Sequence, residues 1–281
     1  GSEPWLKNLV SAALREDPSR RPHLREIVAH LQRLKAIQQV QDEDRSTTAP
    51  VLPFATFGYH LKRGEHETDD RMATRWQMIG AEIARDGIAN ETTFAVDWGS
   101  NQGYFSVALA YAFPRMHVFS VDSNDFYFGV KSQDVHRQRN AEILQSSQLS
   151  RTMLCQGYLS VNAINSFSQP LDYQLALSIF HWLPLRTKDE FHRTLGQFLA
   201  KARTTFLELP EAGHEGSAHA KAYLHWYSPS EPMAEVIRSA LETTDTLYTV
   251  RYIGNSTIAA TRRASATTRQ LFRIDVLAET V

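Results

Sequence analysis

Short apolar runs alternate with amphipathic segments along most of the chain. Buried strands are predicted at Thr93–Trp98, Met116–Val121, Thr152–Gln156, Tyr173–Ile179 and Thr204–Leu209. Apolar residues recur at helical spacing in Tyr104–Ala112, Phe126–Gln145, Val161–Phe167, Lys188–Lys201 and Pro232–Leu241. Buried strands separated by helices predict an α/β fold with a doubly wound, mostly parallel sheet.

Both ends of the chain depart from this alternation. Residues 4–41 carry two helical apolar stripes, and Ala49–Pro53 is a proline-containing extended stretch. A further helix is predicted from the polar turn after Gly64 to about Gly87, ahead of the first strand. Near the C-terminus, Leu247–Ile253 and Gln270–Leu277 are strand-like with no helix between them, which predicts an antiparallel hairpin. We therefore expect a helical segment at 1–45, a linker at 46–64 and the α/β domain at 65–281.

Composition narrows the class of protein. The chain has 281 residues, of which 42% are apolar, so it can build a full core. Thirty basic and 31 acidic residues give a net charge of −1, so overall charge provides no drive toward nucleic acid or an anionic membrane. The single cysteine, Cys155, excludes internal disulfides and cysteine-based metal sites. No apolar run approaches the roughly 20 residues of a membrane span, and no signal peptide is recognisable, so we expect a cytoplasmic protein.

One strand-to-helix connection carries the main chemical signal. The strand ending in Asp97-Trp98 runs into Gly99-Ser100-Asn101-Gln102-Gly103, and a helix follows. The glycines let a ligand approach the backbone, and the start of the helix presents free N–H groups. Asp122 ends the next predicted strand, where a carboxylate can accept hydrogen bonds from both ribose hydroxyls of a nucleoside. A nicotinamide cofactor is the weaker interpretation, because its G-x-G-x-x-G pattern requires glycine where Asn101 stands.

The same connection resembles motif I of the class I S-adenosylmethionine-dependent methyltransferases, in which an Asp precedes Gly-x-x-x-Gly. Asp97, Gly99 and Gly103 match that motif, and the resemblance extends over about residues 57–281. It implies a Rossmann-like fold, an enzyme of the methyltransferase class and S-adenosyl-L-methionine as cofactor. By the same resemblance, the cofactor-binding residues are Asp97, Gly99, Asn101, Gly103, Asp122, Ser123, Gln156 and Ser178.

Methyl transfer depends on alignment of donor and acceptor in a site that excludes water. Aromatic residues expected at the same sheet edge could wall that site: Tyr104, Phe180, Trp182, Trp226 and Tyr227. A hydroxyl or amine acceptor benefits from a base, for which His181 is the first candidate and Glu208 the second. An anionic acceptor needs no base.

Two further patterns are given less functional weight. His214 and His219 are five residues apart, whereas a helical zinc motif requires four, so we predict no metal site and interpret the stretch as a lid over the acceptor. Arg71 and Arg75 are four residues apart on one helical face near the expected site entrance. We interpret that pair as part of a solvated face, although arginine is well suited to phosphate and carboxylate.

The first segment also carries a resemblance. Leu14-Arg15-Glu16-Asp17-Pro18-Ser19-Arg20-Arg21-Pro22 resembles the Leu-x-x-Asp-Pro-x-x-Arg-Pro turn at the C-terminal end of protein kinase domains. Other kinase motifs are absent from the sequence, so the resemblance implies a kinase domain upstream. The combination is similar to the bacterial kinase/methyltransferases that cap O-antigen polysaccharides, which makes a sugar or sugar phosphate the leading acceptor. The alternatives are another small oxygen or nitrogen acceptor, a catalytically silent nucleoside-binding scaffold, and a nicotinamide oxidoreductase.

Overall fold

The computed structural model describes residues 48–50, 52, 60–61, 65–66, 70–100, 103–122, 151–156, 160–166, 171–177, 179–180, 183–209, 232–244, 246–258 and 267–279. The helices expected within 1–45 and at Phe126–Gln145 lie outside these ranges.

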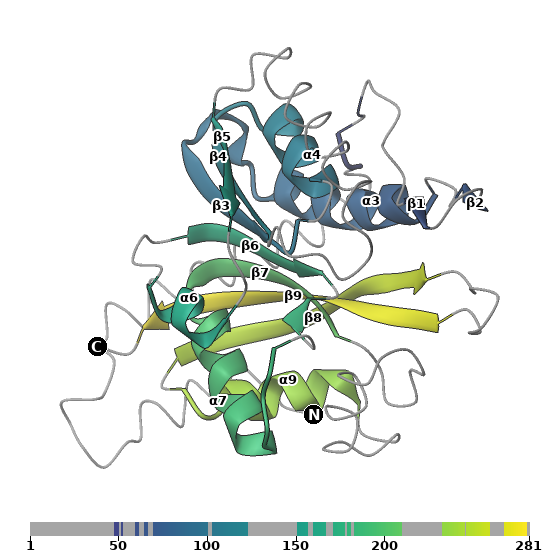
Figure 1. The fold of residues 1–281 in the computed structure, drawn as a ribbon. Helices are drawn as coiled ribbons and strands as arrows, with labels where there is room; N and C mark the ends of the chain where they lie inside the picture. Colours follow the sequence, from purple (N-terminus) through teal and green to yellow (C-terminus); the bar gives the residue numbers. More distant parts are fainter. Residues whose placement is uncertain are drawn as a thin grey trace, which may run out of the picture.

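A seven-stranded sheet forms the centre of the fold (Figure 1). Its strands are β3 (Thr93–Trp98), β4 (Met116–Asp122), β5 (Thr152–Gln156), β6 (Leu171–Leu177), β7 (Ala202–Leu209), β8 (Thr246–Ile258) and β9 (Thr267–Glu279). Their spatial order is β5-β4-β3-β6-β7-β9-β8. Neighbours from β5 to β7 are parallel, whereas β9 runs antiparallel to both β7 and β8. The predicted mostly parallel sheet with a C-terminal hairpin is confirmed. A separate two-stranded ribbon pairs β1 (His60–Leu61) with β2 (Glu65–His66).

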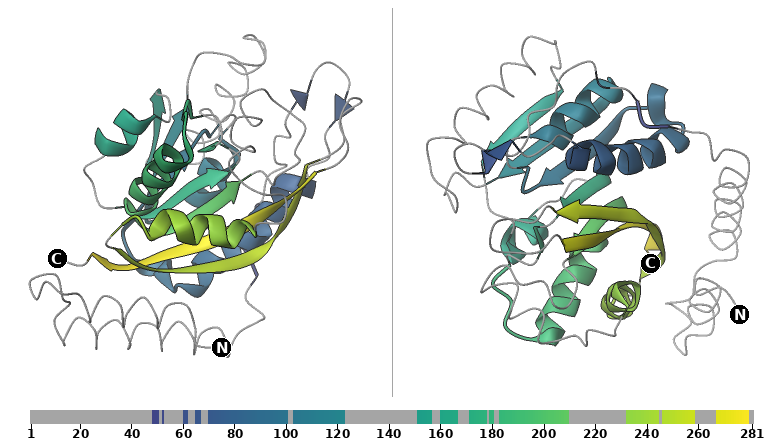
Figure 2. Two further views of the ribbon diagram at one scale, coloured as in Figure 1. Left: turned by 90° about the horizontal axis from the view of Figure 1, so that it is seen from below. Right: turned by 90° about the vertical axis from the view of Figure 1, so that its right-hand side faces the viewer.

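Helices cover both faces of the sheet (Figure 2). One face is covered by α3 (Asp70–Arg85) and α4 (Tyr104–Ala112). The other is covered by α6 (Val161–Ser166), α7 (Lys188–Leu199) and α9 (Met233–Leu241). A short 3-10 helix, η2 (Ile88–Asn90), leads into β3. Because both faces are covered, the central strands are almost continuously buried. Of the helices in the described ranges, none is long and apolar enough to cross a membrane.

An ionic cluster fixes the C-terminal end of α3 to the hairpin. Arg273 on β9 donates hydrogen bonds to both Asp86 and Asp275, at 2.8 and 3.0 Å for the shortest contacts. Glu82 accepts hydrogen bonds from Arg251 and Arg273. Burial by itself would raise the pKa of Glu82, but the hydrogen bond from Arg251 and the neighbouring guanidinium charges hold it below its ordinary value. The cluster therefore orients α3 along the sheet.

Residues expected to belong to the linker contact the same helix. The indole Nε1 of Trp76 donates a hydrogen bond of 2.9 Å to the carbonyl oxygen of Pro50. Ala49 is buried against α3, and a Cβ atom on Gly80 would lie 2.9 Å from the Cβ of Ala49. This part of the segment at 46–64 thus packs on the core of the α/β domain.

Candidate active site

The connection from β3 to α4 lies where the strand order reverses. β3 has β4 on one side and β6 on the other, and in open α/β sheets this position forms a ligand-binding crevice at the carboxyl ends of the strands. The backbone N–H groups of Gly99 and Ser100 both donate to the carbonyl oxygen of Val121, at 2.8 and 3.0 Å. The loop is thereby held against the end of β4.

Two glycines in this connection occupy left-handed backbone conformations. Gly99 has a φ of 67°, and a Cβ atom there would lie 2.6 Å from Cδ1 of Ile179, which follows β6. Gly103 has a φ of 81° and precedes α4 without a side chain that could cap the helix. Both positions favour glycine, since side chains with a Cβ rarely adopt such φ values. The chain therefore turns sharply at Gly99 and again at Gly103, and Gly103 itself is buried.

Asp97 is a buried carboxyl beneath this loop. It is 3% exposed and accepts a hydrogen bond of 2.7 Å from the hydroxyl of Ser106 on α4. Burial raises the pKa of Asp97 to about 7, an effect that the hydrogen bonds from Ser106 oppose and the nearby charge of Asp122 reinforces. Asp97 therefore ties β3 to the first turns of α4 and titrates near neutral pH.

Asp122 lies at the end of β4, next to the connection that follows β3. It is the last residue of β4 and is partly exposed. Its partner in the parallel ladder is Gln156, the last residue of β5. The structure thus brings Asp97, Gly99, Gly103 and Asp122 to one sheet edge and places the backbone of Gln156 beside them. The remaining residues expected at the site lie outside the described ranges: Asn101, Ser123, Ser178 and His181.

Glu208, the second candidate base, lies near the carboxyl end of β7 and is fully buried. Nη2 of Arg75 on α3 donates a hydrogen bond of 3.0 Å to Oε1 of Glu208, and the hydroxyl of Ser256 on β8 donates to the same oxygen. The expectation that Arg75 belongs to a solvated face was wrong, because the residue is only 8% exposed. Only the helical spacing of Arg71 and Arg75 signalled this position, and nothing in the sequence indicated Ser256.

The aromatic residues expected to wall the site take different positions. Phe180 is completely buried, with its ring centroid 5.6 Å from that of Phe191 and 5.4 Å from that of Phe198. It therefore belongs to the core on the α7 face, which corrects its assignment to an acceptor wall. Tyr104 is buried in edge-to-face contact with Phe105. Trp182 and the stretch 210–231, with its histidines and aromatics, lie outside the described residues.

Comparisons with known proteins establish the fold. No family model matches the sequence, and no curated protein matches it significantly. A 2.2 Å crystal structure of WbdD is similar at 15% identity and a TM-score of 0.51, over 85% of this chain and 46% of that one. A low-resolution WbdD structure gives 16% identity and a TM-score of 0.50, over 87% and 42%. The N-terminal domain of EvdMO1, crystallised in the presence of SAH and D-fucose, gives 12% identity and a TM-score of 0.44, over 87% and 96%.

The chain spans less than half the length of either WbdD structure. At 15–16% identity, the similarity to WbdD shows a shared fold. The seven-stranded, mostly parallel sheet with its antiparallel C-terminal hairpin is a Rossmann-like α/β fold.

Proposed function

We propose that this chain is a class I S-adenosylmethionine-dependent methyltransferase that transfers a methyl group to an oxygen or nitrogen acceptor. One observation carries the proposal: the glycine connection between β3 and α4 faces the same sheet edge as Asp122 at the end of β4. The Rossmann-like fold supports it, since ligands of such sheets bind at that edge.

The residues present fit the cofactor. Gly99 is partly exposed and takes a left-handed turn at the end of β3, and the partly exposed residue Asp122 suits the two ribose hydroxyls. S-adenosyl-L-methionine would supply an electrophilic methyl group on a positively charged sulfur. The protein's own contribution is to orient that methyl toward the acceptor and to exclude water. We assign Asn101, Ser123, Gln156 and Ser178 to the same cofactor site.

The acceptor determines whether a base is needed. For a hydroxyl acceptor we propose that His181, four residues after the end of β6, accepts the proton. Glu208 is less suited to act as the base, because its side chain is fully buried and paired with Arg75. A phosphate acceptor is already anionic and requires only positioning.

We further propose that residues 1–45 are the C-terminal end of a kinase domain, joined through 46–64 to the methyltransferase domain at 65–281. The motif at Leu14–Pro22 supports this division and makes a sugar or sugar phosphate the leading acceptor. If the division is right, a chain lacking residues 3–41 should bind S-adenosylhomocysteine as the full chain does. Loss of that binding would contradict the proposed boundary.

A methyl-transfer assay tests the proposed activity directly. The full chain is incubated with methyl-labelled S-adenosylmethionine and a panel of sugars, sugar phosphates and small amines, and label is followed into the acceptor. We expect transfer to at least one acceptor. Saturable S-adenosylhomocysteine binding without any transfer across the panel would favour the silent scaffold. Binding of NAD in place of the sulfur nucleosides would favour the oxidoreductase.

A further inference from the structure

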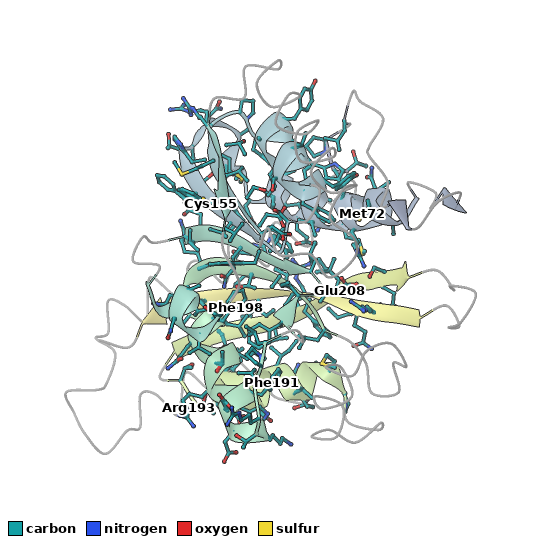
Figure 3. All side chains as sticks on the ribbon, viewed as in Figure 1. Met72, Cys155, Phe191, Arg193, Phe198 and Glu208 are labelled. Carbon is teal, nitrogen blue, oxygen red and sulfur yellow. The ribbon has the colours of Figure 1, made fainter. Side chains whose placement is uncertain are left out.

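Arg75 is held at the carboxyl edge of the sheet by groups more deeply buried than itself. The side chain of Arg75 is 10% exposed, whereas that of its ion-pair partner Glu208 is completely buried. Ser256 is also completely buried and donates its hydroxyl hydrogen bond to the same carboxylate oxygen. The carboxylate of Glu208 and the hydroxyl of Ser256 thus lie deeper in the protein than the guanidinium of Arg75 and hold it in place. Figure 3 labels Glu208, which lies near the carboxyl end of β7, and Met72 on α3, the helix that carries Arg75.

The guanidinium of Arg75 has hydrogen-bond donors to spare. An arginine carries five N–H donors. Nη2 donates to Glu208 at 3.0 Å, and among the described residues the contact of Nη1 is with Sδ of Met72, a weak acceptor, at 3.7 Å. Nε of Arg75 is buried with no hydrogen-bond partner in the described part of the chain. A buried donor without a partner costs free energy, which a ligand that accepts hydrogen bonds would recover.

Arg269 adds a second guanidinium to the same face of the sheet. In the ladder between β8 and β9, Arg269 lies opposite Ser256, and in the ladder between β7 and β9, Leu271 lies opposite Glu208. Residues directly opposite each other share a face, and so do residues two apart on one strand. Arg269 is 6% exposed. Two arginines thus lie on the face that carries Glu208 and Ser256.

This cluster is close to the proposed cofactor site. Asp97 on β3 lies beside Leu175 on β6, and Leu177, two residues further along β6, lies beside Glu208 on β7. Adjacent strands are about 4.8 Å apart, so β7 is displaced from β3 by about 10 Å. Glu208 is also further toward the carboxyl edge than Asp97. A small acceptor whose reacting atom lay at the carboxyl end of β6 would reach from the cofactor site at β3 to the arginines near β7.

We propose that Arg75 and Arg269 bind an anionic group, a carboxylate or a phosphate, carried by the methyl acceptor. Guanidinium groups bind both kinds of oxyanion through charge-assisted hydrogen bonds. Glu208 and Ser256 are positioning residues that orient Arg75. The identity of the bound molecule as the acceptor depends on the proposed methyltransferase function, whereas the presence of the anion subsite does not.

Calorimetric titration of the full chain with inorganic phosphate and with acetate, in the presence and absence of S-adenosylhomocysteine, tests the subsite. We expect saturable binding to the wild-type chain. Arg75→Gln and Arg269→Gln should each weaken it by about tenfold or more, because each removes charged hydrogen bonds. Ser256→Ala should weaken anion binding without changing S-adenosylhomocysteine affinity. Arg238→Gln is the matched control, since Arg238 pairs with Glu235 on the distant helix α9 and should leave anion binding unchanged.

Arg75→Gln removes the guanidinium that pairs with the buried carboxylate of Glu208, so the folding of this variant must be controlled. The double variant Arg75→Gln/Glu208→Gln removes both charges. It should melt cooperatively, bind S-adenosylhomocysteine and fail to bind the anion. Tighter binding of phosphate than of acetate would identify a phosphorylated acceptor, and the reverse order a carboxylate.

Absence of saturable anion binding to the wild-type chain would overturn the subsite, as would unchanged affinity in Arg269→Gln and in the double variant. These outcomes are distinct from failure of the proposed function. Anion binding that depends on Arg75, in a chain that does not bind S-adenosylhomocysteine, would leave the subsite standing and contradict the methyltransferase assignment. Binding of S-adenosylhomocysteine without anion binding would contradict the subsite and leave the methyltransferase assignment standing.

Discussion

Replacing Asp97 with asparagine should stabilise the ligand-free protein at alkaline pH. Burial raises the pKa of Asp97 from its ordinary 3.8 to about 7. Between these values the folded protein binds a proton that the unfolded chain has released, so stability falls as the pH rises through this window. The loss amounts to about 4 kcal/mol above pH 7, because each pKa unit corresponds to about 1.4 kcal/mol. Asparagine is isosteric, is neutral throughout and can still accept the hydrogen bond from Ser106.

Urea unfolding of wild type and Asp97→Asn at pH 5 and pH 8 measures this effect. The stability advantage of the variant should be about 3 kcal/mol larger at pH 8 than at pH 5, since most of the window lies between those values. Because Asp97 also belongs to the proposed cofactor site, the variant should bind S-adenosylhomocysteine more weakly. Equal differences in stability at the two pH values would refute the assignment of a buried carboxyl that titrates near neutrality.

Three other variants test separate parts of the account. Gly99→Ala should lower the free energy of unfolding in urea by about 1–3 kcal/mol. The loss should exceed that of Gly87→Ala, because Gly87 has a similar φ but no atom within 4 Å of an added Cβ. Equal losses would show that the close approach of Ile179 to Gly99 does not matter. Glu82→Gln should lower the free energy of unfolding by about 1–3 kcal/mol at pH 7 and by less at pH 3. The lowered pKa of Glu82 means that its contribution to stability is lost as the pH falls, so an equal loss at both pH values would contradict this. With a hydroxyl acceptor, His181→Ala should reduce turnover about 10²–10⁴-fold and remove a pH-rate limb near 6.5, and an unchanged rate and profile would exclude His181 as the base.

Local pattern was enough to predict several elements with their bounds. The strands Thr93–Trp98 and Thr152–Gln156 and the helix Tyr104–Ala112 lie where the sequence predicts them. These segments have apolar spacing that fits one secondary structure, and the glycine connection ends a strand and begins a helix within a few residues. The positions of Asp97, Gly99, Gly103 and Asp122 at one edge then follow from parallel pairing, which places successive strand ends together.

Burial of charged and aromatic side chains could not be predicted in the same way. Arg75 has the spacing of a solvated helix position, but it is buried and pairs with Glu208, 133 residues later in the chain, whose carboxylate also accepts a hydrogen bond from Ser256. Phe180 follows a strand as an acceptor-facing aromatic would, but it packs against Phe191 and Phe198 of α7 within the core on that face of the sheet. Both outcomes depend on contacts between distant segments, which local periodicity does not encode.

The most direct measurement of the central claim is calorimetric titration of the full chain with S-adenosylhomocysteine. The account predicts saturable binding to wild type and a loss of about 1–3 kcal/mol in Asp122→Ala, because the carboxylate's hydrogen bonds to the ribose are removed. Asp172→Ala is the control. Asp172 accepts a hydrogen bond from the backbone N–H of Phe94 and pairs with Arg203 at the opposite, amino end of the sheet. The affinity of Asp172→Ala for S-adenosylhomocysteine should therefore be unchanged. No binding to wild type, or equal affinity for wild type and Asp122→Ala, would contradict a nucleoside site at the ends of β3 and β4.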